Sequence, residues 1–191
     1  MKKRIIIAIT GASGSIYGIS LLEAFKQTKQ FETHLIYSKA AQITIPTETD
    51  YSLKDIEKIA DVTHKIGDIA ASISSGSFKT EGMIVAPCSM KSLAEIATGL
   101  SNTLISRAAD VVMKEKRKLV LMVRETPFNS IHLTHMLNLS NMGVYIAPPL
   151  PAFYNNPKNV DDIVDHSVGR VLDIFDVDNN LARRWKDSNT I

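Results

Sequence analysis

The stretch Ile9-Thr10-Gly11-Ala12-Ser13-Gly14-Ser15-Ile16-Tyr17-Gly18 decides the fold class of this chain. It joins an apolar run, residues 5–9, which is typical of a buried strand, to residues 19–25, which are typical of a helix. A glycine-rich turn between a first strand and a first helix is where α/β proteins hold phosphate groups, because the helix start offers unpaired N–H groups and the positive end of its dipole. The sequence therefore predicts a nucleotide or another phosphate-bearing cofactor at this turn.

The rest of the chain repeats this alternation of strand and helix. We expect strands at residues 4–10, 34–37, 63–66, 82–86, 119–123 and 144–146, and helices at residues 15–28, 53–60, 92–97, 102–116, 132–141 and 160–175. Such a rhythm predicts a single-domain α/β fold, a flavodoxin- or Rossmann-like parallel sheet with helices on both faces. We expect one domain over residues 1–191. The proline-rich segment 148–151 then serves as a stiff connector, and a tail from about residue 176, with Arg183, Arg184 and Trp185, lies at a subunit interface.

Composition limits the function classes. The 191 residues are 45% hydrophobic and carry a net charge of +2, which gives no argument for nucleic acid as a partner. No apolar run reaches the ~18 residues that span a bilayer, so we expect a cytoplasmic protein that binds no membrane. Cys88 is the only cysteine and the five histidines lack zinc-ligand spacing, so no metal is expected. Cys88 follows a strand end, where it could serve as a nucleophile, but packing of a small buried side chain is favoured.

Polar residues follow the ends of the predicted strands. In an open parallel sheet, ligands bind beyond the carboxyl ends of the strands, and the segments found there are residues 11–14, 38–39, 87–92, 124–127 and 148–154. A single hydroxyl such as Ser13 or Ser89 could be a helix cap, but the loops together favour a ligand site.

Three cations lie at the margins of predicted apolar helix stripes. Arg107 and Lys114 flank a stripe of the helix at 102–116, and Arg170 lies at the edge of a stripe of the helix at 160–175. Each could extend its charge to solvent. Together they could also line an anionic pocket.

Other cofactor motifs do not fit. Residues 11–18 match neither the dinucleotide pattern G-x-G-x-x-G nor the P-loop pattern. Tyr154 and Lys158 imitate the Tyr-x-x-x-Lys pair of short-chain dehydrogenases, but Pro157 opposes the continuous helix that this pair requires.

The ordered set of motifs resembles the flavin prenyltransferases, also called UbiX-like proteins and known too as components of phenolic acid decarboxylases, within the FMN-binding flavoprotein superfamily. The resemblance covers nearly the whole chain. It rests on the motifs at residues 10–14, 38–41, 47–49, 75–78, 86–89, 97–99, 107–111, 124–128, 130–133, 139–143 and 153–154.

This resemblance implies an activity and its partners. Members of the family join a dimethylallyl group, from dimethylallyl monophosphate, to N5 and C6 of reduced FMN. The product, prenylated FMN, serves UbiD-type decarboxylases. The resemblance also implies a homododecamer whose active sites are built between subunits of a trimer.

The resemblance also implies site residues. Those expected to hold FMN are Gly11, Ala12, Ser13, Ser38, Ser89, Met90, Lys91, Ser92, Arg107 and Arg124. Those expected to hold the donor phosphate are Lys114, Arg124, Tyr154 and Arg170. Glu125 and Glu48 are expected to transfer protons, with Ser13 near the flavin. A salt bridge is the alternative role for Glu125, and a solvated loop charge is the alternative for Glu48.

One departure and two rival functions stay open on the sequence. Ile69 stands where some relatives carry an aromatic residue that can stabilise an allylic cation. An FMN-dependent cysteine decarboxylase would share the fold, but such enzymes use a histidine soon after the second strand, where this chain has Ala40-Ala41-Gln42. A non-enzymatic flavin carrier that delivers its cofactor to a decarboxylase is the other rival.

Overall fold

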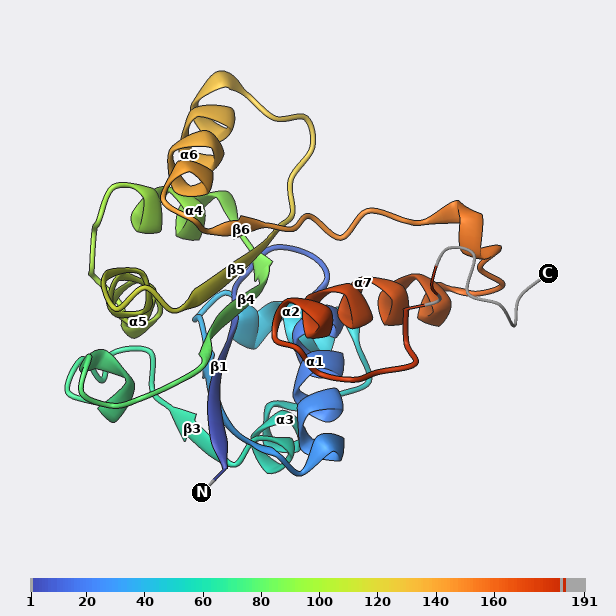
Figure 1. Cartoon of the computed structure of the whole chain (residues 1–191), viewed down its shortest axis with the longest axis horizontal. Coiled ribbons are helices and arrows are strands. Elements are labelled where there is room, and N and C mark those ends of the chain that lie inside the picture. The colour runs from blue at the N-terminus through green and yellow to red at the C-terminus, as the bar shows by residue number, and fades with distance from the viewer. Residues whose placement is uncertain (1, 183, 185–191) are drawn as a thin grey trace. The chain divides into compact units, whose positions relative to one another are not determined.

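The computed structural model describes residues 2–182 and 184, and the chain divides into two compact units, Met1–Pro148 and Pro149–Ile191 (Figure 1). The division falls within the proline-rich segment that the sequence predicts as a connector. A single domain over the whole chain stays a prediction. No helix among the described residues has the length and apolar character needed to cross a membrane.

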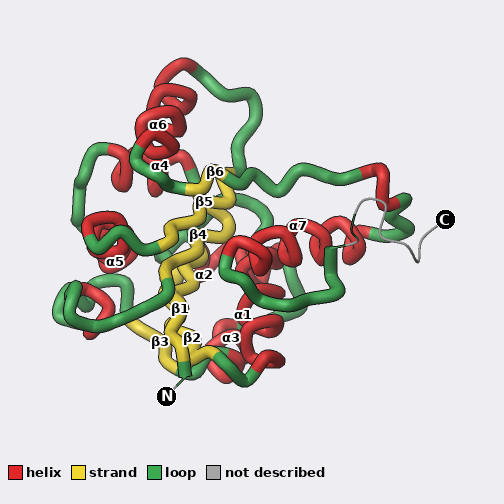
Figure 2. Tube along the Cα trace, viewed as in Figure 1, coloured by secondary structure: helices red, strands yellow, loops and turns green. Residues whose placement is uncertain are grey.

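The first unit is built on a six-stranded sheet in which all neighbouring strands are parallel (Figure 2). The strands are β1 (Lys3–Ile9), β2 (Phe31–Tyr37), β3 (Val62–His64), β4 (Gly82–Cys88), β5 (Lys118–Val123) and β6 (Tyr145–Ile146), in the order β3-β2-β1-β4-β5-β6. The predicted α/β class is therefore confirmed. The strand order reverses between β1 and β4, and such a switch point is where open parallel sheets bind their ligands.

Helices cover both faces of this sheet (Figure 1). One group consists of α1 (Ser15–Thr28), α2 (Ala41–Glu48) and α3 (Leu53–Ile59), which contact one another. The other group consists of α4 (Met90–Ala97), α5 (Leu104–Lys114) and α6 (Ser130–Asn141), with the short turn η1 (Ser72–Ser74) against α5. The predicted stripe of α5 is confirmed, since Leu104, Ile105, Ala108, Val111 and Val112 are all buried.

The approach of α1 to the sheet depends on Gly18. A Cβ at this position would lie 2.4 Å from the carbonyl oxygen of Ala86 and 2.7 Å from Cγ1 of Ile9. Only a residue without a side chain lets the helix backbone come this near to β1 and β4. This close packing fixes the position of α1, and with it the turn that joins β1 to α1.

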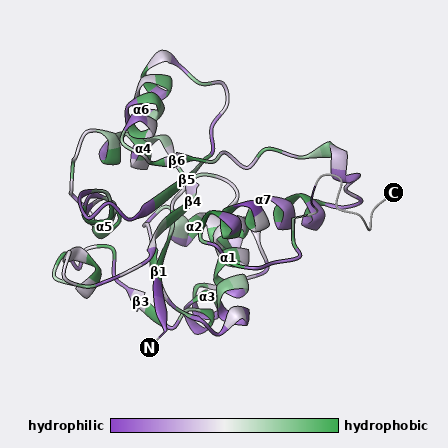
Figure 3. Cartoon of the chain, in the orientation of Figure 1, coloured by the Kyte–Doolittle hydropathy of each residue, from purple (hydrophilic) through white to green (hydrophobic). Residues whose placement is uncertain are grey.

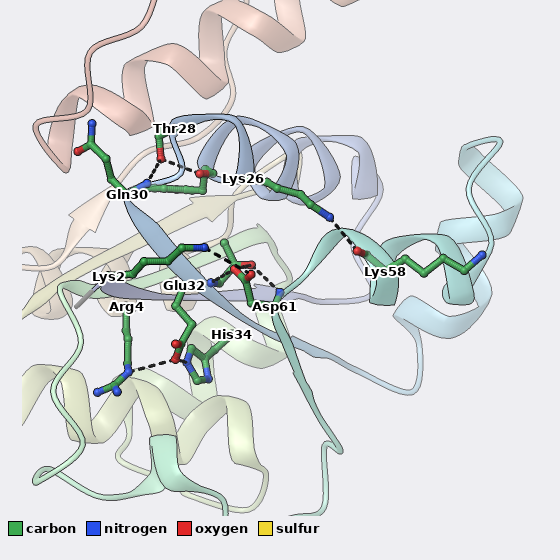
Figure 4. A network of polar contacts seen from close by, with 11 residues as sticks. Lys2, Arg4, Lys26, Thr28, Gln30, Glu32, His34, Lys58 and Asp61 are labelled. Atoms are coloured by element: carbon green, nitrogen blue, oxygen red, sulfur yellow. Dashed lines mark hydrogen bonds and ion pairs between the residues drawn. The ribbon is translucent and has the colours of Figure 1, made fainter.

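A polar network joins side chains of β1, β2 and β3, and Figure 4 shows part of it. Glu32 accepts a hydrogen bond from Arg4 Nε at 3.1 Å and pairs with His34 Nε2 at 2.9 Å, and His34 Nδ1 pairs with His64 Nε2 at 2.9 Å. Burial lowers the pKa of His34, whereas the hydrogen bond to His34 lowers the pKa of Glu32. The network therefore links side chains of β1, β2 and β3 across the sheet.

The element boundaries depart from the sequence expectations in a few places. Helix α2 is absent from those expectations. It contains Pro46, although proline opposes helix interiors, and it ends two residues later. Strand β2 begins three residues before the expected start, and β4 continues through Pro87 to Cys88. Helix α5 begins only after Thr103, whose side chain accepts a hydrogen bond from Ser106 N in a capping box.

The second unit contains the 3-10 turn η2 (Phe153–Asn155) and helix α7 (Val160–Ile174). The residues after α7 fold back on it. Asn179 Nδ2 donates to Gly169 O at 3.3 Å, and Arg184 Nη2 donates to Asp173 Oδ1 at 2.7 Å. Part of the expected interface tail, Arg183 and Trp185 included, lies outside the described residues.

Candidate functional site

A cavity of about 610 Å³ lies at the carboxyl ends of β1, β2 and β4 in the first unit. Its volume is within the range of about 300–1,000 Å³ that small-molecule and cofactor sites occupy. The cavity lies at the carboxyl ends of the strands, where the sequence predicts a ligand site. The lining residues are Thr10, Gly11, Ser38, Lys39, Ala40, Ile66, Gly67, Ser89, Lys91, Ser92, Glu95, Asn102, Thr103 and Ile105.

The Thr10 hydroxyl and a close backbone approach at Gly11 join the strand ends beside the cavity. Thr10 Oγ1 donates to Pro87 O at 2.6 Å and accepts from Ser89 N at 2.9 Å, which joins the end of β1 to the end of β4. A Cβ at Gly11 would lie 2.3 Å from the Cβ of Ala40, so the turn after β1 packs directly against the segment after β2. Any side chain at Gly11 would push these two walls apart.

The start of α4 forms a polar wall of the cavity. Ser89 is the N-cap of this helix, and its Oγ accepts from Ser92 N at 3.3 Å. Lys91 Nζ lies 3.6 Å from Glu95 Oε1. Because the first N–H groups of a helix have no partner inside the helix, this wall offers donors and a positive dipole end to an anionic ligand. Met90 packs against the hydrophobic core beside this wall.

The start of α1 binds a carboxylate of the chain itself. Glu48 Oε2 accepts from Gly14 N at 2.8 Å and from Ser15 N at 3.3 Å. Glu48 is the last residue of helix α2, so it is not on a loop, and its exposed side chain is hydrogen-bonded. Ala12 is half-buried and Ser13 exposed in the same turn.

The loop between β5 and α6 carries the predicted Arg124 and Glu125, both exposed. Arg124 N donates to Cys88 O at 3.1 Å, which fixes the start of this loop beside the end of β4. Burial raises the pKa of Tyr17 on α1, and the positive charge of Arg124 acts against this rise. Glu125 Oε1 accepts from Thr126 N at 3.0 Å, and Glu125 forms no ion pair with another described residue.

Two predicted cations of α5 lie away from the lining of the cavity. Arg107 donates to Ser74 O at 3.2 Å and pairs with Asp110 at 2.8 Å, which ties α5 to η1. Lys114 pairs with Glu115 at the end of α5. The first residues of α5 adjoin the cavity, and an 11-residue helix is about 16 Å long, so Lys114 lies well away from the cavity of its own chain.

The remaining predicted residues, Tyr154 and Arg170, belong to the second unit. Tyr154 lies on η2 with its ring edge-on to the ring of His166, at a centroid distance of 5.7 Å. Arg170 Nη1 donates to Asp173 Oδ2 at 2.8 Å on α7.

The sequence reasoning misses part of the cavity lining. It places Asn102 and Thr103 in a helix, yet they precede α5 and reach the cavity. Asn-Thr before an apolar stripe is a typical N-cap signal, and that signal could have shown that these residues precede the helix. Nothing in the sequence points to Ile66 and Gly67. Cys88, by contrast, behaves as predicted, because complete burial raises the pKa of its thiol to about 12 and favours packing over nucleophilic catalysis.

The chain is similar over most of its length to known flavoproteins. The sequence profile of the Flavoprotein family matches residues 1–176. The flavin prenyltransferase UbiX of Escherichia coli (strain K12) is 50% identical over 186 residues, which cover 96% of this chain and 98% of that protein.

Two solved structures share both fold and sequence. A dodecameric FMN-dependent UbiX-like decarboxylase from Escherichia coli O157:H7 is 55% identical, with a TM-score of 0.94 over 96% of this chain and 99% of that one. AnUbiX (PadA1) in complex with FMN and dimethylallyl pyrophosphate is 49% identical, with a TM-score of 0.95 over 97% of this chain and 98% of that one.

Proposed function

The chain belongs to the flavin prenyltransferases of the Flavoprotein family, and we propose that its cavity at the ends of β1, β2 and β4 is where FMN is prenylated. The reaction joins a dimethylallyl group, from dimethylallyl monophosphate, to N5 and C6 of reduced FMN. The observation that carries the proposal is the cavity of about 610 Å³ at the sheet's switch point, lined by Gly11, Ser38, Ser89 and Ser92. Identities of 49–55% with flavin prenyltransferases and UbiX structures do not favour the cysteine decarboxylase or the carrier.

The cavity fits FMN by shape and by donor chemistry. The close contact of Gly11 with Ala40 leaves backbone rather than side chain facing the ligand. Hydroxyl groups and N–H groups at the start of α4 can bind phosphate and flavin oxygens, with Lys91 supplying charge. In this proposal Gly11, Ala12, Ser13, Ser38, Ser89, Met90, Lys91, Ser92 and Arg124 hold FMN. Arg107, which does not line the cavity of its own chain, is proposed to hold FMN within the assembled protein.

The donor phosphate requires cations. Breaking the allylic C–O bond leaves its electron pair on the phosphate, and fixed positive groups around that phosphate stabilise the charge as it develops. Arg124, Arg170 and the hydroxyl of Tyr154 supply these contacts, with Lys114 as the fourth group. Since Lys114 lies far from the cavity of its own chain, we propose that it serves the site of a neighbouring subunit.

Proton transfer is the remaining task. When a new bond forms at C6, the proton at that carbon must leave, and a carboxylate within hydrogen-bond reach can accept it. Glu125 is the proposed acceptor, because it lies exposed beside Arg124 and forms no ion pair with other described residues. Glu48 and Ser13 are proposed to assist at the β1–α1 turn, where Glu48 is hydrogen-bonded.

We expect the protein to assemble as a homododecamer through surfaces that include α6. Only Leu139 of this helix is buried, whereas Ile131, Leu133 and Leu137 are 63%, 54% and 60% exposed. Figure 3 shows hydrophobic residues, in green, along α6. The helix contains no Asp, Glu, Lys or Arg, and large exposed apolar side chains of this kind mark interaction surfaces.

A single charge on α6 tests this assembly. Leu137→Glu is expected to shift the protein from a dodecamer to smaller species in sedimentation velocity, because burying an unpaired carboxylate in an interface is costly. Lys54→Glu on α3 serves as the matched control and is expected to leave the assembly unchanged. A variant of Leu137 that still sediments as a dodecamer would remove α6 from the interface, and a monomeric unmodified protein would contradict the assembly itself.

The activity is tested by anaerobic incubation of the purified protein with reduced FMN and dimethylallyl monophosphate, followed by mass spectrometry of the released flavin. We expect a mass gain of one C5 prenyl unit. Unmodified FMN, with binding confirmed and with the diphosphate donor also inactive, would overturn the proposal. The product is proposed to pass to a UbiD-type decarboxylase in the cytoplasm, and a decarboxylase activated by the released flavin would support that step.

A further inference from the structure

His166 lies on α7 between the two residues of the second unit that are proposed to hold the donor phosphate. Its ring meets the ring of Tyr154 at an interplanar angle of 87° and a centroid distance of 5.7 Å. Arg170 follows four residues later, so the two side chains share one face of the helix. The roles assigned above leave this histidine unused.

A second contact ties the turn that carries Tyr154 to the same histidine. Asn155 Nδ2 and His166 Nδ1 are 2.7 Å apart. An amide nitrogen can only donate, so in this arrangement Nδ1 accepts and the neutral ring carries its proton on Nε2. Burial lowers the pKa of His166, and the charges of Arg170 and Arg184 lower it further, against the opposing charge of Asp173. The neutral imidazole of His166 therefore fits both the hydrogen bond from Asn155 and the nearby positive charges.

A further hydrogen bond joins the same face of α7 to residues 154–158. Lys158 N donates to Asp162 Oδ2 at 2.6 Å, and Asp162 precedes His166 by four residues. Asp162 and His166 thus fasten residues 154–158 to α7, and Arg170 lies on the next turn of that face. The imidazole ring contacts Tyr154 and stands one helical turn from Arg170.

We propose that His166 is a positioning residue that holds Tyr154 at a set place relative to Arg170, so that the two bind the donor phosphate together. The proposal rests on the function proposed above, in which both residues bind that phosphate. His166 itself touches the Tyr154 ring and the Asn155 amide and needs no contact with the reacting atoms.

Two substitutions separate the contacts of His166. His166→Ala removes both the ring contact and the acceptor, whereas His166→Phe keeps a ring against Tyr154 and removes the acceptor. An edge-on aromatic pair and a neutral hydrogen bond together correspond to a change of about tenfold in affinity. We expect the Kd of dimethylallyl monophosphate, measured by calorimetry on the protein with oxidised FMN, to rise about tenfold in His166→Ala and less in His166→Phe. FMN affinity should stay unchanged.

A double-mutant cycle with Tyr154→Ala distinguishes positioning from a general loss of structure. If His166 acts through Tyr154, His166→Ala adds no further loss of donor affinity in the Tyr154→Ala background. Asp165 lines the same small pocket as His166. Asp165→Asn is the matched control and should bind the donor with the affinity of the unmodified protein.

Additive losses, or a His166→Ala variant with unchanged donor affinity, would overturn the positioning role. The prenyl-transfer assay on the unmodified protein shows separately whether the proposed function itself holds. If that protein prenylates FMN and the cycle is additive, only the role of His166 fails.

Discussion

Replacing Glu125 by glutamine is expected to slow prenyl transfer by about 10²–10⁴-fold, the usual contribution of a positioned general base, while FMN is retained. The amide cannot accept the proton that leaves C6. Glutamine still has an oxygen that can accept from Thr126 N, a contact of 3.0 Å for Glu125, so the loop should keep its shape. The rate is measured in a single turnover under anaerobic conditions, with flavin binding followed by fluorescence.

The control for Glu125 is Glu81→Gln. Glu81 precedes β4 and pairs with Lys3 at 3.9 Å, at the opposite end of the strands from the cavity. This variant is expected to turn over as the unmodified protein does. Unchanged turnover in Glu125→Gln would remove Glu125 from the chemistry, and loss of FMN would reassign it to binding.

The sheet and its binding edge could be predicted because each depends on local pattern. The apolar run at 5–9 and the glycine turn after it define β1 and the start of α1, and parallel strands bring their carboxyl ends to one edge. Gly11, Ser38 and Ser89 come from three different strand ends, and all three line the cavity. The predicted strand ends, together with the parallel arrangement of the strands, were enough to bring these residues together.

Helix α2 and two stretches of the lining escaped prediction for physical reasons. Pro46 lowers helix propensity, but the helix is short and ends soon after the proline, so few backbone contacts are lost. Ile66-Gly67 and Asn102-Thr103 belong to irregular segments with no repeating pattern, and Leu104 N donates to Ile66 O at 2.9 Å. That pairing depends on the tertiary fold and leaves no periodic signal.

The predicted cations show a different limit of sequence reasoning. Arg107 and Lys114 both lie beside the α5 stripe, as the helical period requires, yet neither reaches the cavity of its own chain. Helical periodicity predicts on which side of a helix a residue lies. It does not predict whether that side faces the site of its own subunit or that of a neighbouring one. Their assignment to FMN or to the donor therefore depends on the assembly.

Glu48 carries two possible roles, and a pair of substitutions separates them. Its carboxylate accepts from Gly14 N at 2.8 Å and from Ser15 N at 3.3 Å, at the positive end of α1. Glu48→Ala removes this cap, and we expect it to lower the free energy of unfolding by about 1 kcal/mol, since such contacts at an exposed helix start are modest. Urea unfolding of the two proteins measures this loss.

Glu48→Gln keeps an oxygen that can accept from the same N–H groups but provides no carboxylate to take a proton. If Glu48 transfers a proton, this variant loses about 10²-fold or more in prenyl transfer while its stability falls less than that of Glu48→Ala. If Glu48 only caps α1, glutamine preserves turnover and only the alanine variant is impaired, in stability first. The rate loss and the stability loss of the glutamine variant therefore decide between the two roles. A cap needs only an oxygen that accepts a hydrogen bond, whereas a proton acceptor needs the charged carboxylate.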